Sequence, residues 1–148
     1  MVHVIVVTHG DLGSSLIRAV KMIAGQQDKL MAYGLFPDQS REDLAAELEQ
    51  GLADQEQSYL ILTDMYGGSP SITATMLAKG RDNIEVISGV NLPMILEAVM
   101  TRDNLSLEKL AAYIVDNTQK SIVRVKKILD EGLTGGGGSQ PQCVIAPK

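Results

Sequence analysis

A histidine and an aspartate in this chain each stand at the end of an apolar run. His9 closes the run 4–8 and precedes Gly10, while Asp64 follows the run 59–63. Both runs are typical of buried strands, so each polar residue is expected at the rim of a sheet. A neutral imidazole is nucleophilic near pH 7, and a carboxylate on its second nitrogen would orient the ring and stabilise its positive charge. If the strands are neighbours, the pair suits a histidine that becomes phosphorylated.

The stretch Gly67-Gly68-Ser69-Pro70 lies directly beyond Asp64 and has the pattern of a helix start. We expect serine at the cap and proline at the first helical position. The amides and dipole at such a start favour an anion, and glycines let it approach the backbone. Gly67, Gly68 and Ser69 are therefore predicted to contact a phosphoryl group, with plain helix capping as the alternative.

Other residues beside these positions complete the predicted site. Thr8 and Gly10 flank His9 and are expected to shape its turn and line the phosphoryl site. The apolar residues at the same rim represent either ordinary loop packing or a docking surface, because methionine and tyrosine are common at protein interfaces. The residues predicted to dock protein partners are Leu12, Met65, Tyr66, Leu92 and Met94.

Strand and helix patterns alternate four times along the chain. The alternation predicts a three-layer α/β/α fold with a mainly parallel, doubly wound sheet of about four strands. Right-handed crossovers bring the carboxyl ends of such strands to one edge, where ligand chemistry belongs. Strands are expected at residues 2–7, 30–36, 59–63 and 84–87, and helices at 13–24, 40–52, 69–80, 91–100 and 106–129, the last a long amphipathic helix.

The chain divides into a domain and a tail. Its 148 residues favour one domain, which we place at residues 1–131. Residues 132–148 contain the run Thr134-Gly135-Gly136-Gly137-Gly138-Ser139 and are predicted to be a flexible Gly-rich tail or linker. The run is compatible with a joint to a further domain and with an engineered spacer.

Composition narrows the function classes. The net charge is −5 and no basic face is visible, so a nucleic-acid partner is not expected. The single cysteine, Cys143, supports neither a disulfide framework nor a zinc site. Signal-peptide and membrane-helix patterns are missing, which predicts a cytoplasmic protein. Because nucleotide-binding loops and metal-binding carboxylate pairs are also missing, we expect no cofactor, no metal, and a phosphoryl group supplied by an energised donor.

Three stretches, residues 6–10, 63–70 and 89–94, together closely resemble the IIA component of the mannose-type (mannose–fructose–sorbose) sugar phosphotransferase system. The resemblance covers roughly residues 2–130. It implies that Nε2 of His9 accepts a phosphoryl group from HPr while Nδ1 faces Asp64, and that a IIB component receives the group. The membrane components IIC and IID would be served indirectly. Relatives often have tryptophan where this chain has Met65-Tyr66, a departure that concerns partner or sugar branch rather than the chemistry.

The resemblance also implies a homodimer, with exchange of C-terminal segments as one way to form it. A related phosphocarrier of dihydroxyacetone kinase systems is an alternative, although the Gly-Gly-Ser-Pro and Val-Asn-Leu-Pro-Met stretches favour the sugar branch. A non-catalytic small-molecule-binding α/β module is a third reading. A histidine phosphatase or mutase is disfavoured, because it needs arginines around the phosphate and none lies near His9 or Asp64. The sugar stays unidentified, since a carrier never contacts it.

Overall fold

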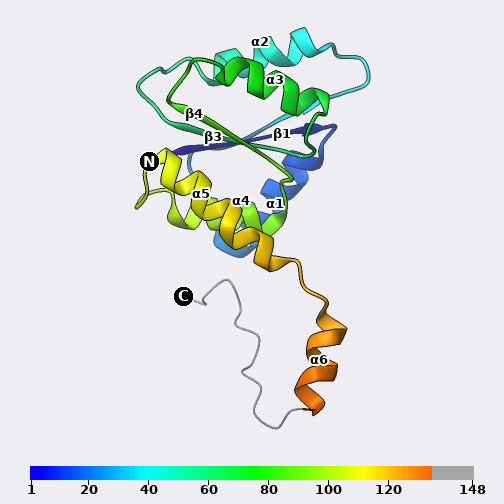
Figure 1. Cartoon of the computed structure of the whole chain (residues 1–148). Helices are drawn as coiled ribbons and strands as arrows, with labels where there is room; N and C mark the ends of the chain where they lie inside the picture. The colour runs from blue at the N-terminus through cyan, green and yellow to red at the C-terminus, as the bar shows by residue number, and fades with distance from the viewer. Residues whose placement is uncertain (135–148) are drawn as a thin grey trace.

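Strands and helices alternate through most of the chain in the computed structural model, which describes residues 1–134, with side chains through residue 130 (Figure 1). The predicted tail at 132–148 lies outside the described residues from residue 135 onward. The elements are β1 (His3–His9), α1 (Leu12–Ala24), β2 (Leu30–Leu35), α2 (Arg41–Gly51), β3 (Tyr59–Thr63), α3 (Ser69–Ala78), β4 (Ile84–Ser88), α4 (Leu92–Thr101), α5 (Leu107–Thr118), the 3₁₀ turn η1 (Gln119–Ser121) and α6 (Val125–Thr134).

The four strands form one parallel sheet in the order β2-β1-β3-β4. The predicted α/β fold is thereby confirmed. The chain first runs from β1 to β2 on one side and then returns to place β3 on the other side, so the strand order reverses between β1 and β3. The register pairs Val7 with Thr63, and these two strands consequently end side by side. Crevices at such reversals are the usual ligand sites of parallel sheets.

Helices cover both faces of the sheet, as Figure 1 shows, with α2 and α3 on one side and α1, α4 and α5 on the other. Alternate residues of β1 enter the two cores. Ile5 and Val7 pack with Leu44 and Leu48 of α2, while Val4 and its even-numbered neighbours pack against α1, α4 and α5. Because the central strands are buried on both faces, their apolar character is continuous and their polar ends mark the rim.

Two predicted helix starts are confirmed in atomic detail. The Ser40 hydroxyl accepts the N–H of Asp43 at 3.1 Å, and the Asp43 carboxylate accepts the Ser40 N–H at 2.9 Å, which is a complete capping box. At α4, the Asn91 side chain accepts the N–H of Met94 at 2.9 Å. Both starts depend on residues three apart, so the local sequence is sufficient to specify them.

The single long helix predicted for residues 106–129 is wrong. Helix α5 ends at Thr118, Ile122 is extended with φ −85° and ψ 100°, and α6 begins only at Val125. The Thr118 hydroxyl donates to the Ile114 carbonyl at 2.6 Å, and the β-branched residues Ile122 and Val123 follow. Both features weaken the preference for helix in this segment. Ile122 is 81% exposed, so no core contact holds this segment helical. In Figure 1, α6 extends away from the layered body.

Within residues 1–134, none of the helices has the length and apolar character required to cross a bilayer.

Candidate functional site

The reversal of strand order brings His9 and Asp64 together. His9 is the last residue of β1, and Asp64 directly follows the last residue of β3. The Nδ1 atom of His9 lies 2.7 Å from Oδ2 of Asp64, and the backbone N–H of His9 donates to the same oxygen at 2.8 Å. The other carboxylate oxygen accepts the N–H of Met65 at 2.8 Å. The predicted meeting of the two strand ends is confirmed.

This contact determines which ring nitrogen of His9 is available. A carboxylate accepts hydrogen bonds, so its bond to Nδ1 holds the ring proton there and leaves the lone pair on Nε2. The side chain of His9 is 49% exposed, whereas that of Asp64 is 12% exposed. The arrangement therefore presents a nucleophilic nitrogen to solvent and keeps its supporting carboxylate beneath it.

Asp64 is held in its charged form. Partial burial raises the pKa of Asp64, but the hydrogen bonds from the His9 backbone, the His9 ring and the Met65 backbone outweigh burial, and the net pKa lies below the ordinary 3.8. Asp64 is consequently an anion across the neutral range. An anion in this position stabilises the positive charge that the His9 ring acquires when Nε2 forms a bond.

The start of α3 lies beside the His9 ring. Gly68 is the N-cap residue, and a Cβ atom placed there would lie 3.1 Å from Cε1 of His9 and 2.9 Å from Cγ of Met65. Gly67 has φ +77°, a left-handed conformation that favours glycine. The first amides of a helix lack intrahelical acceptors and lie at its positive end. The site thus joins a nucleophilic nitrogen to a place that favours an anion.

Ser69 is not the helix cap that the sequence pattern predicts. Gly68 takes that position, with φ −70° and ψ 160° and without a side-chain bond, and Ser69 is the first helical residue. The first helical bond runs from the Ile72 N–H to the Gly68 carbonyl at 2.9 Å, one residue earlier than expected. The Ser69 hydroxyl is therefore not committed to capping.

Thr8 and Gly10 have structural roles at the turn after β1. The Thr8 side chain is fully buried, and its hydroxyl accepts the N–H of Gly13 at 2.9 Å. Gly10 has φ +54°, and its N–H donates to the Leu35 carbonyl at 2.9 Å. The side chain of Thr8 and the N–H of Gly10 therefore shape the turn, and the predicted contacts of these two residues with a phosphoryl group stay a prediction.

The predicted docking residues separate into an exposed and a buried set. Leu12, Met65 and Tyr66 are 45%, 57% and 91% exposed around the site. Leu92 is half-buried and packs against the core. Met94 is only 6% exposed, so its prediction as a docking residue is wrong; in the first turn of α4 its side chain belongs to the core cluster.

The sequence reasoning missed Phe36. Its side chain is 44% exposed, and it follows β2 at the edge where β1 ends. A Cβ atom on Gly34 would lie 2.9 Å from the Phe36 ring and also against the Gly10 carbonyl, which places the ring near the turn after His9. The available signal in the sequence was that Phe36, the single phenylalanine, ends the predicted strand 30–36 and directly precedes Pro37.

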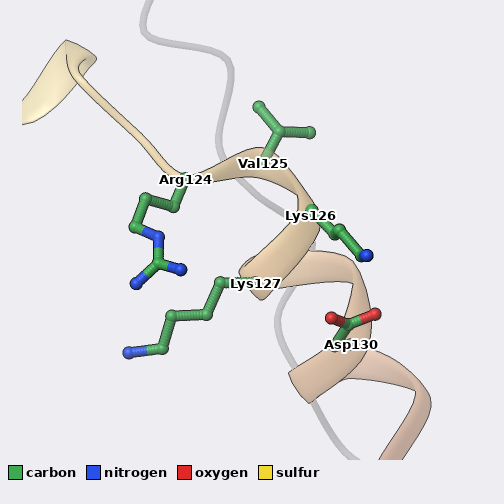
Figure 2. A pocket seen from close by; sticks show the side chains of 5 residues that line it. All are labelled: Arg124, Val125, Lys126, Lys127 and Asp130. Atoms are coloured by element: carbon green, nitrogen blue, oxygen red, sulfur yellow. The ribbon is translucent and has the colours of Figure 1, made fainter.

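A separate hollow of about 530 Å³ lies at the start of α6, and Figure 2 shows its lining. Arg124, Val125, Lys126, Lys127 and Asp130 all come from one segment, and none is a predicted site residue. Among residues 1–134, no group of three or more His, Cys, Asp or Glu side chains is arranged to hold a metal ion.

Gly68→Ala should displace the His9 ring without unfolding the domain. The Gly68 backbone conformation suits any L-residue, so the expected effect comes from the new methyl group pressing on Cε1 of His9 and on Met65. The chain has only two histidines, and the ring-proton NMR signal of His9 should shift while that of His3 does not.

Ser106→Ala is a matched control for this variant. Ser106 is the N-cap of α5 with φ −65° and ψ 160° and without a side-chain cap bond, so the change places alanine in nearly the same backbone geometry. Both histidine signals should stay in place in this variant. An unmoved His9 signal in Gly68→Ala would show that the helix start does not press on the ring.

Comparisons with known proteins give a consistent picture. The EIIA-man family, described as PTS system fructose IIA component, matches residues 3–115. The chain is similar to the fructose-specific EIIA component of Bacillus subtilis strain 168, with 31% identity over 82% of this chain and 84% of the relative. It is also similar to the sorbose-specific EIIA component of Klebsiella pneumoniae, with 33% identity over 77% of this chain and 84% of the relative.

A longer relative and a solved structure extend the comparison. The mannose-specific EIIAB component of Escherichia coli strain K12 is 28% identical over 97% of this chain, and the chain spans 46% of its length. The crystal structure of the phosphotransferase system component EIIA from Streptococcus agalactiae superposes with a TM-score of 0.81 and 27% identity, covering 86% of this chain and 99% of that one.

Proposed function

Because the chain belongs to the EIIA-man family, the mannose-type IIA components of the sugar phosphotransferase system, we propose that it carries its phosphoryl group on Nε2 of His9. HPr is the proposed donor and a IIB component the proposed acceptor, so that the membrane components IIC and IID are served indirectly. The observation that carries the proposal is the 2.7 Å contact between Nδ1 of His9 and Asp64. It leaves Nε2 as the exposed nucleophile.

In the proposed transfer, the Nε2 lone pair of His9 attacks the phosphorus atom of phosphorylated HPr. A bond forms between Nε2 and phosphorus while the bond between phosphorus and the donor atom breaks, and the donor leaves with that electron pair. The proton on Nδ1 stays there, and Asp64 balances the positive ring. The phosphoryl oxygens lie at the start of α3, where the Ser69 hydroxyl and the first amides favour negative charge. Placement and electrostatics therefore supply the catalysis.

The exposed rim supports the proposed partners. Leu12, Met65 and Tyr66 are close to His9 or Asp64 along the chain and expose apolar surface that a docked protein would cover. Phe36 extends this surface toward β2. One rim that serves both donor and acceptor in turn must fit two proteins, and flexible methionine side chains suit that requirement. Because the series of phosphoryl transfers begins with phosphoenolpyruvate, the proposal places this protein in the cytoplasm.

Reconstitution tests the proposal directly. The protein is incubated with phosphoenolpyruvate, enzyme I and HPr, and intact mass spectrometry is expected to show the gain of one phosphoryl group that acid removes and alkali does not. Adding a IIB component should then discharge it, whereas the phosphoryl acceptor of a dihydroxyacetone kinase system should not. A chain that gains no mass would refute the proposal, and discharge only by the kinase system would move it to that branch.

We also propose that the protein is a homodimer formed along β4. This strand is at the sheet's edge, and hollows flank it on both sides, one lined by Met76 and Val86 and the other by Ile87, Val115 and Ile122. An open edge with apolar flanks favours pairing with another chain. The extended, exposed segment at 122–124 is a candidate to take part.

At micromolar protein concentration, the parent is expected to sediment as a dimer and Ile122→Asp as a monomer, because the substitution places a charge in the apolar contact. Sedimentation velocity measures the difference. Met22→Asp is the matched control, since Met22 of α1 is 88% exposed and Ile122 is 81% exposed. A monomeric parent chain, or a dimer that survives Ile122→Asp, would contradict the dimer proposal.

A further inference from the structure

Three hydroxyl groups form a connected cluster beneath the site. Ser88, the last residue of β4, places its Oγ 2.6 Å from Oγ1 of Thr63 and 2.9 Å from Oγ of Ser71. Thr63 is fully buried and Ser71 is 4% exposed. The transfer described above does not use any of the three. Ser88 is partly buried, and hydroxyls at such distances form directional bonds that hold the attached backbone segments in place.

Each end of this cluster joins one half of the site. Thr63 ends β3 and directly precedes Asp64, and its carbonyl accepts the N–H groups of Gly89 and Val90, both at 2.9 Å. Ser71 lies in the first turn of α3, two residues beyond Ser69. Ser88 therefore connects the strand end that carries the supporting carboxylate to the helix start that faces the phosphoryl oxygens.

The first turn of α3 has no side-chain cap, so it is held by the burial of Pro70 and by the bond between Ser71 and Ser88. The N-cap residue Gly68 has no side-chain atoms to bond the first turn, in contrast to Ser40 at α2 and Asn91 at α4, whose side chains cap their helices. Pro70 also has no N–H to donate. The bond from Ser88 to Ser71 instead ties the first turn of α3 to the sheet.

We propose that Ser88 is a positioning residue for phosphoryl transfer, which sets the distance between the His9–Asp64 pair and the start of α3 through its bonds to Thr63 and Ser71. The inference rests on the proposed phosphoryl acceptance by His9. Ser88 itself does not contact the phosphoryl group. Misplacement by about 1 Å costs a catalysed step on the order of 100-fold, so a smaller shift of one helix turn has a measurable effect on rate.

Ser88→Ala is expected to lower the maximal rate of phosphoryl acceptance about tenfold, with an unchanged HPr concentration at half-maximal rate. The half-saturating HPr concentration stays the same because HPr docks on the exposed rim, which the substitution does not alter. The maximal rate falls because the helix start shifts relative to Nε2. Ser88→Thr keeps the hydroxyl and should restore the rate. Single-turnover mixing with phosphorylated HPr over a range of HPr concentrations measures both quantities.

Thr101→Val is the matched control. Its hydroxyl donates to the Glu97 carbonyl at 2.7 Å at the end of α4, so the variant also loses one partly buried hydroxyl bond, but remote from the site. It should accept phosphoryl groups at the parent rate. If Ser88→Ala does not fold, Ser71→Ala breaks the same connection from the helix side and should show the same loss of maximal rate.

The outcomes separate the two proposals. A parent chain that takes up no phosphoryl group would refute the proposed function, and the role of Ser88 would fail with it. A parent chain that is phosphorylated, together with a folded Ser88→Ala variant that reacts at the parent rate, would refute the role of Ser88 alone. An equal loss in Thr101→Val, or a rise in half-saturating HPr concentration without a change in maximal rate, would also overturn it.

Discussion

His9→Ala should abolish phosphoryl acceptance and leave the fold intact. His9 is half-exposed at the end of β1 and contributes nothing to either core cluster, so its removal costs little packing. The variant has no nucleophile at the start of α3, and neighbouring hydroxyls are poor replacements for an imidazole near neutral pH. Intact mass spectrometry after incubation with phosphoenolpyruvate, enzyme I and HPr should show only the unmodified mass, while the circular dichroism spectrum matches the parent.

The chain provides its own control in His3, at the opposite end of the same strand. Burial lowers the pKa of His3, with Lys29 contributing in the same direction, so His3 is a neutral imidazole at pH 7. It has a ring contact with Tyr59, at 5.2 Å between centroids, and no carboxylate on a ring nitrogen in the described structure. His3→Gln should therefore be phosphorylated like the parent. Phosphorylation of His9→Ala, or its loss in His3→Gln, would contradict the assignment.

Asp64→Asn should slow phosphoryl acceptance by roughly 10²–10⁴-fold, the range found when a supporting acid or base is removed. The amide oxygen can take the place of Oδ2 and still accept the backbone N–H and the Nδ1–H of His9, whereas the amide nitrogen cannot accept the N–H of Met65. The negative charge is lost, however, and with it the stabilisation of the positive ring. Rapid-quench measurement of the phosphorylated fraction against time gives the rate constant.

Asp11→Asn separates the role of this carboxylate from the general effect of negative charge near the site. Asp11 is the exposed N-cap of α1, two residues beyond His9, and its side chain makes no capping bond. Its replacement removes one charge without touching the His9 ring, so the rate should stay within about twofold of the parent, as is usual for exposed charges. A rate for Asp64→Asn that equals that of Asp11→Asn would show that Asp64 does not support the reaction.

The pattern of apolar runs was sufficient to locate the sheet and the polar residues at the ends of its strands. Strands β1 and β3 are buried on both faces, so their hydrophobic runs end sharply at the residues that leave the core. The capping residues Ser40 and Asn91 were predictable for the same kind of reason, because a cap bonds an amide only three residues away. The exact ends of the elements were predicted less accurately. Strand β4, for example, extends to Ser88, one residue past its predicted end.

The errors share a different cause. Met94 is a residue type common at interfaces, but its position on α4 places its side chain in the core. The long C-terminal helix was predicted because apolar residues recur at helical spacing before and after residues 119–121, but Ile122 is 81% exposed and gains little burial from helix formation. Side-chain orientation and burial depend on neighbours from other elements, which spacing along one element does not contain.

By itself, the sequence determined which residue types stand at strand ends and helix starts, because hydrophobic burial and capping act over a few neighbouring residues. Only the tertiary structure decided that one oxygen of Asp64 accepts both the ring and the backbone of His9, and that Ser88 joins Thr63 to Ser71. These contacts span 55, 25 and 17 residues of sequence. They exist because the strand order β2-β1-β3-β4 and its register bring distant strand ends to one edge. The packing of the whole sheet determines this order and register.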